Sequence, residues 1–400
     1  MTRTRIYFPF IFILLFALQS CTEPGTNREE VISNYANMVH QSYSDSYQNA
    51  LAMQKTIGQF LENPTEEGLK MAKSSWLEAR DIYGKTEVYR ETNSPVDVEY
   101  SETNPWGFAN EGQMNAWPID DSYIDYAAEG TEAYAGFYPS VIGDTTVHIT
   151  PELLVDLNEK DTDKSISTGW HAIEFLLWGQ DNTLPKENMP GMRQFSDYTS
   201  APNAERRGQY LEVVTALLIA DLKKLVDTWA VGGAYRTIFE NLDTETALTQ
   251  LVNGAFFLAG DELSSERMIA PVDSTDGVDG SGQEDEHSCF ADNTHRDIYV
   301  NMVGINNVIF GTYDTISGPS FYDLVLEVDK KQANLLKQAA DKAMTSVTVI
   351  ADHEQPFDYL ITQETSSDTN FGPIMQSVAA LQELGNEISV SANILGINLR

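Results

Sequence analysis

The chain has 400 residues, of which 42% are hydrophobic, enough for a sizeable core in one large or two medium domains. Its 60 acidic residues outnumber its 25 basic ones, which gives a formal charge of -35 at pH 7. Because phosphate binding requires a basic face, this charge argues against nucleic acid as a partner.

The N-terminus has the pattern of an export signal. Arg3 and Arg5 precede an apolar run, 6–18, that is shorter than the roughly 20 residues needed to span a bilayer. The run ends at Ser20-Cys21, which resembles the bacterial lipoprotein box, in which the cysteine is acylated and becomes the mature N-terminus. The alternative is an ordinary cleaved signal followed by a chance cysteine.

The lipoprotein interpretation predicts a signal peptide over 1–20 and a polar tether over 21–28. Acyl chains on Cys21 would then hold an exported protein in the cell envelope, at the outer membrane or the periplasmic face, without a spanning helix. The second cysteine, Cys289, has no partner once Cys21 is acylated, so we expect no disulfide.

Helices are predicted to dominate the rest of the chain, because apolar residues recur near the 3.6-residue period. In chain order they are expected over 29–61, 64–90, from 151, 167–179, 203–229, 244–269, 296–309, 320–350 and 372–395. Long loops are expected over 91–115, 180–201 and 271–286, the last acidic, glycine-rich and flexible, with room for a brief strand at 144–150. We therefore expect an all-α fold of two bundle-like lobes, 29–200 and 201–400.

The most informative stretch is the apolar run Gly-Trp-His-Ala-Ile-Glu-Phe-Leu-Leu-Trp-Gly over 169–179. Its two polar residues, His171 and Glu174, share one face of a helix because they lie three positions apart. A buried carboxylate is costly unless it is paired or bound to a metal. The pair is therefore either a hydrogen-bonded helix lock or part of a zinc or iron site. A ferritin-like di-iron site is disfavoured, because it needs Glu-x-x-His on two helices.

Other polar positions upstream could complete such a site. Arg80 and Glu87 share one face of the helix expected over 64–90. They form either an ion pair on a solvated edge or an inward set, with Glu87 as a third metal ligand and Arg80 bracing a carboxylate. Asp120 is a second candidate ligand, because a stiff Trp-Pro turn precedes it. Of Asp120 and the aspartate after it, one is expected to cap a helix.

Two clusters downstream are less specific. The segment 286–295 contains His287 and His295, which either bind a metal or pack locally beside a helix cap. Glu262 and Glu266 lie one helical turn apart and are expected to form ion pairs with basic groups rather than to bind a ligand. The zinc-protease motif His-Glu-x-x-His, the Walker A loop, the Gly-x-Ser-x-Gly elbow, Cys-x-x-Cys and the EF-hand loop do not occur in the sequence.

Five segments of the chain, taken together, resemble the imelysin-like proteins and, among these, the iron-regulated branch. The first is Gly-x-His-x-x-Glu, with the extension His-Ala-Ile-Glu-Phe-Leu-Leu-Trp-Gly-Gln-Asp. The others are Tyr-Gly-Lys-Thr-Glu-Val-Tyr-Arg at 83–90, Asn-Ala-Trp-Pro-Ile-Asp at 115–120, Glu-Leu-Ser-Ser-Glu-Arg-Met at 262–268 and Glu-His-Ser-Cys-Phe at 286–290.

The resemblance implies two helical lobes with the His-x-x-Glu pair near their junction, in an exported, often lipid-anchored protein linked to iron or haem acquisition. The expected ligands of a divalent metal, iron or zinc, are then His171 and Glu174, completed by Glu87 and Asp120. Haem, another iron-bearing ligand and envelope uptake proteins are the partners that it implies. A metallopeptidase, the activity by which the family was first described, and a structural surface protein are the alternatives.

Overall fold

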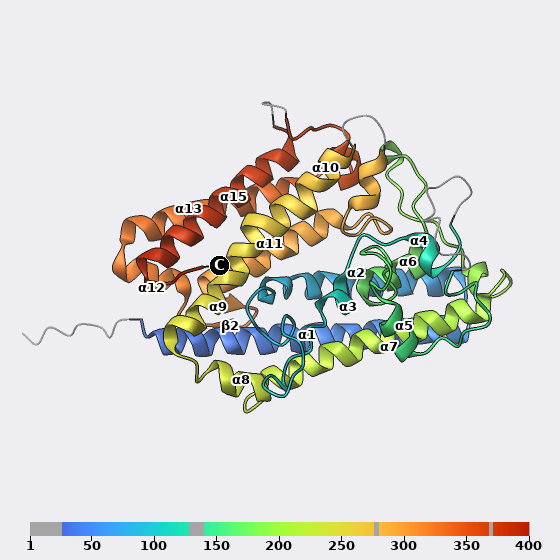
Figure 1. Cartoon of the computed structure of the whole chain (residues 1–400). Coiled ribbons are helices and arrows are strands. Elements are labelled where there is room, and N and C mark those ends of the chain that lie inside the picture. Colours follow the sequence, from blue (N-terminus) through green and yellow to red (C-terminus); the bar gives the residue numbers. More distant parts are fainter. Residues whose placement is uncertain (1–25, 128–139, 276–279, 368–370, 400) are drawn as a thin grey trace, which may run out of the picture.

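The computed structural model describes residues 26–127, 140–275, 280–367 and 371–399 (Figure 1). Its regular structure is almost entirely helical, which confirms the predicted all-α class. The helices form two lobes, with α1 to α8 in the lower part of the view and most of the later helices in the upper part, while α9 lies beside α1 (Figure 1). The predicted signal peptide and Cys21 lie outside the described residues.

The N-terminal lobe is built on the long helix α1 (Arg28–Glu62), against which α2 (Glu66–Gly84) and α7 (Ala204–Trp229) pack. The side chain of Thr65 accepts a hydrogen bond from the backbone N–H of Gly68 and caps α2, which therefore begins at Glu66 rather than at the predicted residue 64. The shorter elements of this lobe are η1 (Glu87–Tyr89), α3 (Glu111–Asn115), α4 (Asp121–Ile124), α5 (Pro151–Leu157), α6 (Gly169–Trp178), η2 (Pro185–Glu187), η3 (Phe195–Tyr198) and α8 (Ala234–Phe239).

The C-terminal lobe centres on α13 (Lys330–Ala351) and α15 (Pro373–Ile394), which pack on each other. Its other elements are α9 (Thr244–Phe257), the π-helix η4 (Leu258–Ile269), α10 (Ala270–Thr275), η5 (Gly280–Asp285), α11 (Thr294–Phe310), α12 (Phe321–Val328) and α14 (Phe357–Ile361). A small antiparallel hairpin pairs β1 (Thr312–Tyr313) with β2 (Ile316–Ser317), with Thr312 opposite Ser317.

Several predicted elements differ in the structure for local reasons. The segment 144–150 is a turn, because Asp144 accepts hydrogen bonds from the backbone and hydroxyl of Thr146. The helix expected over 320–350 divides at Asp329, whose side chain caps α13. The loop expected over 271–286 contains most of α10 and all of η5. Finally, α7 packs beside α1, so the prediction that the second lobe begins near residue 200 is wrong for this helix.

Two glycines allow close contacts between helices. On α6, Gly169 has φ = +84°, and a Cβ there would lie 2.3 Å from the carbonyl oxygen of Met114 at the end of α3. On α2, a Cβ at Gly84 would lie 2.4 Å from Cγ2 of Val300 on α11. The absence of a Cβ leaves room for both contacts, of which the first joins α6 to α3 and the second joins α2 to α11 across the lobes.

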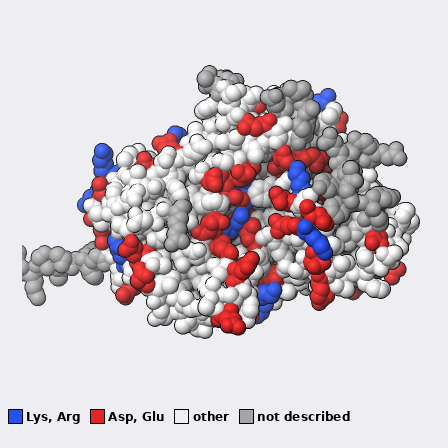
Figure 2. Space-filling model, in the orientation of Figure 1, with Lys and Arg blue, Asp and Glu red and all other residues white. Residues whose placement is uncertain are grey.

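The surface reflects the acidic composition. Aspartate and glutamate outnumber lysine and arginine on the face shown in Figure 2 and gather across its middle. No helix among the described residues is long and apolar enough to cross a membrane.

Candidate functional site

His171 and Glu174 form a buried pair on α6. The Nδ1 atom of His171 lies 2.9 Å from Oε2 of Glu174, and the two side chains are 2% and 0% exposed. The other carboxylate oxygen, Oε1, accepts a hydrogen bond of 2.9 Å from the backbone N–H of Ala291, in the segment before α11. The pair therefore connects α6 of the N-terminal lobe with the C-terminal lobe.

Burial sets the protonation of this pair. Burial, followed by the charge of Arg80, lowers the pKa of His171 well below its usual range, so the imidazole is neutral at pH 7. Burial also raises the pKa of Glu174 well above its usual range, so the tautomer of His171 depends on the proton of Glu174. An ionised Glu174 accepts Nδ1–H and leaves an unprotonated Nε2, an atom that is buried without a hydrogen-bond partner. An unpaired buried polar atom costs about 1–3 kcal/mol. In that tautomer, Nε2 is the position at which His171 can accept a ligand.

A second buried imidazole, His287, lies beside the first. The two ring centroids are 4.8 Å apart. The Nδ1 atom of His287 lies 2.8 Å from Oδ2 of Asp297 on α11, so a carboxylate holds each histidine through Nδ1. Trp117 contacts His287 edge-on, with 4.4 Å between the ring centroids. Burial, and then the neighbouring arginines, lowers the pKa of His287 well below its usual range, so this ring is also neutral.

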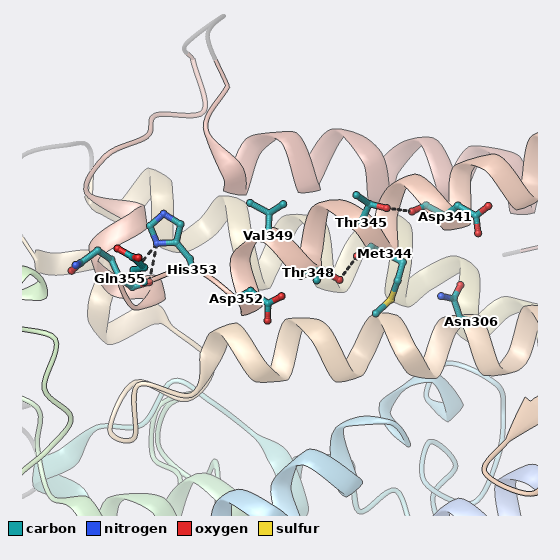
Figure 3. Close-up of a pocket in the computed structure, with 10 residues that line it drawn as sticks. Asn306, Asp341, Met344, Thr345, Thr348, Val349, Asp352, His353 and Gln355 are labelled. Atoms are coloured by element: carbon teal, nitrogen blue, oxygen red, sulfur yellow. Dashed lines mark hydrogen bonds between the residues drawn. The ribbon is translucent and has the colours of Figure 1, made fainter.

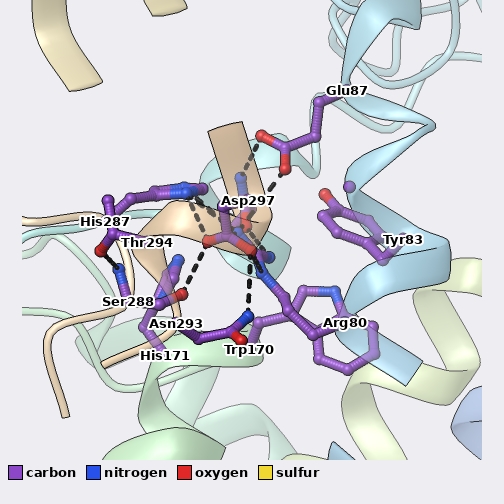
Figure 4. A network of polar contacts seen from close by, with 12 residues as sticks. Arg80, Tyr83, Glu87, Trp170, His171, His287, Ser288, Asn293, Thr294 and Asp297 are labelled. Carbon is purple, nitrogen blue, oxygen red and sulfur yellow. Dashed lines mark hydrogen bonds and ion pairs between the residues drawn. The ribbon is translucent and has the colours of Figure 1, made fainter. Parts of the chain in front are cut away.

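A network of ion pairs between the lobes surrounds the two histidines (Figure 4). Arg80 on α2 donates from Nε and Nη2 to the two oxygens of Asp297, at 3.2 and 3.1 Å. It also lies 3.6 Å from Glu87, which forms a 2.6 Å ion pair with Arg267 of η4. Arg80, predicted either to lie on a solvated edge or to brace a carboxylate, thus does the second.

Glu87 belongs to this network, but its oxygens are already occupied. Besides the two arginines, the side-chain amides of Asn115 and Asn301 donate to it at 3.1 and 3.3 Å. Burial alone would raise the pKa of Glu87, but the two arginines outweigh burial and hold the pKa below its ordinary value. Glu87 is therefore a shared counter-ion to two buried arginines, and its predicted role of metal ligand stays a prediction.

Asp120 serves as the N-cap of α4. Its Oδ1 accepts hydrogen bonds from the backbone N–H and the hydroxyl of Ser122, at 3.1 and 2.7 Å. The capping role that the sequence assigns to one of two adjacent aspartates thus falls to Asp120. Among the contacts of the described chain, none joins Asp120 to His171 or Glu174.

Of the remaining predicted residues, some belong to the ion-pair network and the others lie outside it. Glu262 forms ion pairs with Arg267 and Arg90 at 2.9 and 3.0 Å, as predicted, whereas Glu266 is exposed. His295 is half-buried, and burial lowers its pKa. Of the cluster at 286–295, His287 is the predicted histidine that joins the site.

Sequence reasoning missed Asp297, which holds both Arg80 and His287. A signal was available, because Asp297 and Asn301 lie four positions apart on a helix whose other buried residues are mostly apolar. Arg267 is one of the basic groups that pair with the nearby Glu262. Its contact with Glu87 joins elements that are far apart in the chain, so no local pattern indicates it.

The charges of the network are close to balanced. Three guanidinium groups, those of Arg80, Arg90 and Arg267, face the carboxylates of Glu87, Glu262 and Asp297. Burial raises the pKa of Glu174 well above its usual range and also raises that of Glu111, so these two carboxyl groups add little negative charge.

An open groove of about 960 Å³ lies away from this network, between α11 and α13 (Figure 3). Asn306 lines it from α11, and residues 341–355 of α13 and the following turn line the rest. His353 at its end contacts the backbone of Gln355. None of the predicted site residues lies in this groove.

Comparisons with known proteins agree with this architecture. A crystal structure of a protein named iron-regulated protein A precursor, from Parabacteroides distasonis ATCC 8503 at 2.30 Å resolution, has a TM-score of 0.68. The alignment covers 93% of this chain and 97% of that chain at 17% sequence identity, so it shows a shared fold. No curated protein matches the chain. The imelysin family model, Peptidase M75, matches residues 39–387, and the chain therefore belongs to the imelysin family.

Proposed function

We propose that this protein binds an iron ion, free or within a carrier such as haem, at Nε2 of His171, and serves iron acquisition at the cell envelope. Family membership supports the general class. The protein of similar fold from Parabacteroides distasonis is named as iron-regulated, which supports the choice of iron. The observation that carries the proposal is the buried, unpaired Nε2 atom of His171.

The contacts of this histidine support a role in metal binding. A histidine that binds a metal usually donates its other ring N–H to a carboxylate, which fixes the tautomer and the orientation of the ring. Glu174 occupies that position at 2.9 Å, so we assign it the role of orienting group rather than of second ligand. His287 is the nearest second imidazole, but Nη2 of Arg80 lies 3.2 Å from both of its ring nitrogens, so we assign it no ligand role. Water or groups that the metal brings with it would complete the coordination.

We favour iron binding over a metallopeptidase activity for this site. A catalytic zinc site takes about three protein ligands and keeps a fourth position open for water. The arginine pair that occupies Glu87 removes the carboxylate expected as the third ligand. Within the described chain, a group of three His, Cys, Asp or Glu side chains close enough to share an ion is found only elsewhere, at Asp181, Asp292 and Asp358.

Metal titration of the purified full-length protein tests the proposal. Calorimetry with Fe²⁺ under anaerobic conditions, and absorbance titration with haem, should show one bound equivalent of one of these ligands. His171→Gln should abolish that binding, and Glu174→Gln should weaken it by about 10–100-fold, as expected for an orienting group. His353→Gln, at an exposed histidine, is the matched control.

Two results would contradict this function. Wild-type affinity in His171→Gln would show that the ligand binds elsewhere. Metal-dependent cleavage of a broad peptide library, lost in His171→Gln, would establish the peptidase instead.

The envelope anchor is proposed from the sequence pattern at Cys21. Cys21→Ala should move the protein from the membrane fraction to the soluble fraction of the cell envelope, because the acyl chains would be lost. Cys289→Ala is the matched control, since it removes the other cysteine and should leave the protein in the membrane fraction. Membrane attachment that survives Cys21→Ala would show that the lipoprotein interpretation is wrong.

A further inference from the structure

A second group of carboxylates lies outside the histidine network. Asp181 follows α6, Asp292 precedes α11, and Asp358 stands in the first turn of α14. One carboxylate oxygen of each lies within 4.8 Å of the others. Three elements that are distant in the sequence, one of them from the N-terminal lobe, thus bring their carboxylates to one place.

These carboxylates lack the counter-ions found in the histidine network. In the network, arginines form ion pairs with Glu87, Glu262 and Asp297. At the aspartate group, no lysine or arginine of the described residues forms an ion pair with any member. The side-chain amide of Gln283 donates to Asp181 and to Asp358, at 2.7 and 3.4 Å, but carries no charge. Clustered carboxylates at a partly buried place are unfavourable unless a cation or protons neutralise them.

A fourth carboxylate, independent of these three, points to a ligand. Glu286 is 2% exposed, and its Oε1 is buried without a hydrogen-bond partner. Glu286 is joined to the group through Gln283, whose carbonyl accepts a 3.3 Å hydrogen bond from the backbone N–H of Glu286 and whose side chain donates to Asp181 and Asp358. Burial, and then the charges of Asp358 and Asp292, raises the pKa of Glu286 well above its usual range. One oxygen of Asp292, Oδ2, is likewise buried and unpaired. The group therefore offers buried oxygens that no protein donor satisfies.

We propose that Asp181, Asp292 and Asp358, with Glu286 beside them, bind a calcium ion that joins the loop after α6 to the C-terminal lobe. An all-oxygen, carboxylate-rich set suits a hard cation. Calcium binds oxygen at about 2.3–2.6 Å, so oxygens on one ion lie up to about 5 Å apart, which the observed spacing meets. Calcium is favoured over magnesium because it accepts irregular sets of protein carboxylates, whereas magnesium demands near-ideal octahedral geometry and usually keeps several waters. This site is separate from His171 and does not depend on the proposed iron function.

Calorimetric titration of the chelator-treated, full-length protein with CaCl₂ tests the proposal. Wild-type protein should bind one equivalent, with a dissociation constant on the order of 1 mM or tighter. Asp358→Asn and Asp292→Asn should each weaken binding at least tenfold. Asp227→Asn, at an exposed aspartate of α7, is the matched control and should bind like the wild type.

A second measurement separates loss of the site from loss of the fold. In chelator, Asp358→Asn should melt at or above the wild-type temperature, because it removes a repelling charge. Addition of about 5 mM CaCl₂ should raise the melting temperature of the wild type but not of Asp358→Asn. Absence of calcium binding by the wild type, or an unchanged calcium response in both variants, would overturn the proposal. His171→Gln should retain calcium binding, so the two proposals fail independently.

Discussion

Replacement of Glu87 by glutamine distinguishes a counter-ion from a metal ligand. All four partners of Glu87 are donors: two guanidinium groups at 2.6 and 3.6 Å and two amides at 3.1 and 3.3 Å. Glutamine keeps the shape of the side chain but removes the charge and one acceptor oxygen. Its new NH₂ group must face donors on one side, whichever way the amide is turned.

The expected cost follows from the burial of the whole group. The side chains of Glu87, Arg80 and Arg267 are 0% exposed. Removal of one partner from a buried ion pair costs about 3–5 kcal/mol, because the remaining charge is left uncompensated. Each arginine keeps one other carboxylate, Asp297 for Arg80 and Glu262 for Arg267. We therefore expect Glu87→Gln to lower the free energy of unfolding by about 3 kcal/mol, the lower end of that range.

Urea unfolding at pH 7, followed by tryptophan fluorescence in the presence of chelator, measures this change. Glu212→Gln, at an exposed glutamate of α7, is the matched control and should change the free energy by no more than about 0.5 kcal/mol. A Glu87→Gln protein as stable as this control would refute the counter-ion argument. Destabilisation that occurs only when metal is present would show that Glu87 is a metal ligand after all.

Two further predictions concern the packing around α6. Gly169→Ala should destabilise the protein by about 1–3 kcal/mol or more, because φ is +84° and the new Cβ would meet the Met114 carbonyl. The control Gly58→Ala, which places its Cβ in open space on α1, should not destabilise the protein. Burial, and then Arg193, lowers the pKa of Lys73 to about 8, so NMR of the ¹³C-methylated amine should show a midpoint near 8. Because folding lowers the pKa of Lys73, the free energy of unfolding falls as the pH drops from about 10.5 to 8. Lys73→Met should therefore stabilise the protein more at pH 7 than at pH 11. A midpoint near 10.5 would contradict both statements.

The sequence by itself determined features that depend on neighbouring residues. The spacing of His171 and Glu174 predicted one shared helix face, and the two side chains are in contact. The helices α1, α7 and α15 lie within a few residues of their predicted ends, because apolar period and end signals act over a few positions. The same local reasoning failed at Asp329, where one aspartate caps a new helix inside a continuous helical pattern.

Only the tertiary structure decided which charges meet. Arg80 pairs with Asp297 across 217 positions of sequence, and through Glu87 it shares a counter-ion with Arg267. Whether a buried carboxylate binds a metal or an arginine depends on what the opposite helix presents, and no residue pattern along one helix contains that information. The aspartates that we assign to calcium gather for the same reason: a loop after one helix meets the starts of two others when the lobes pack together.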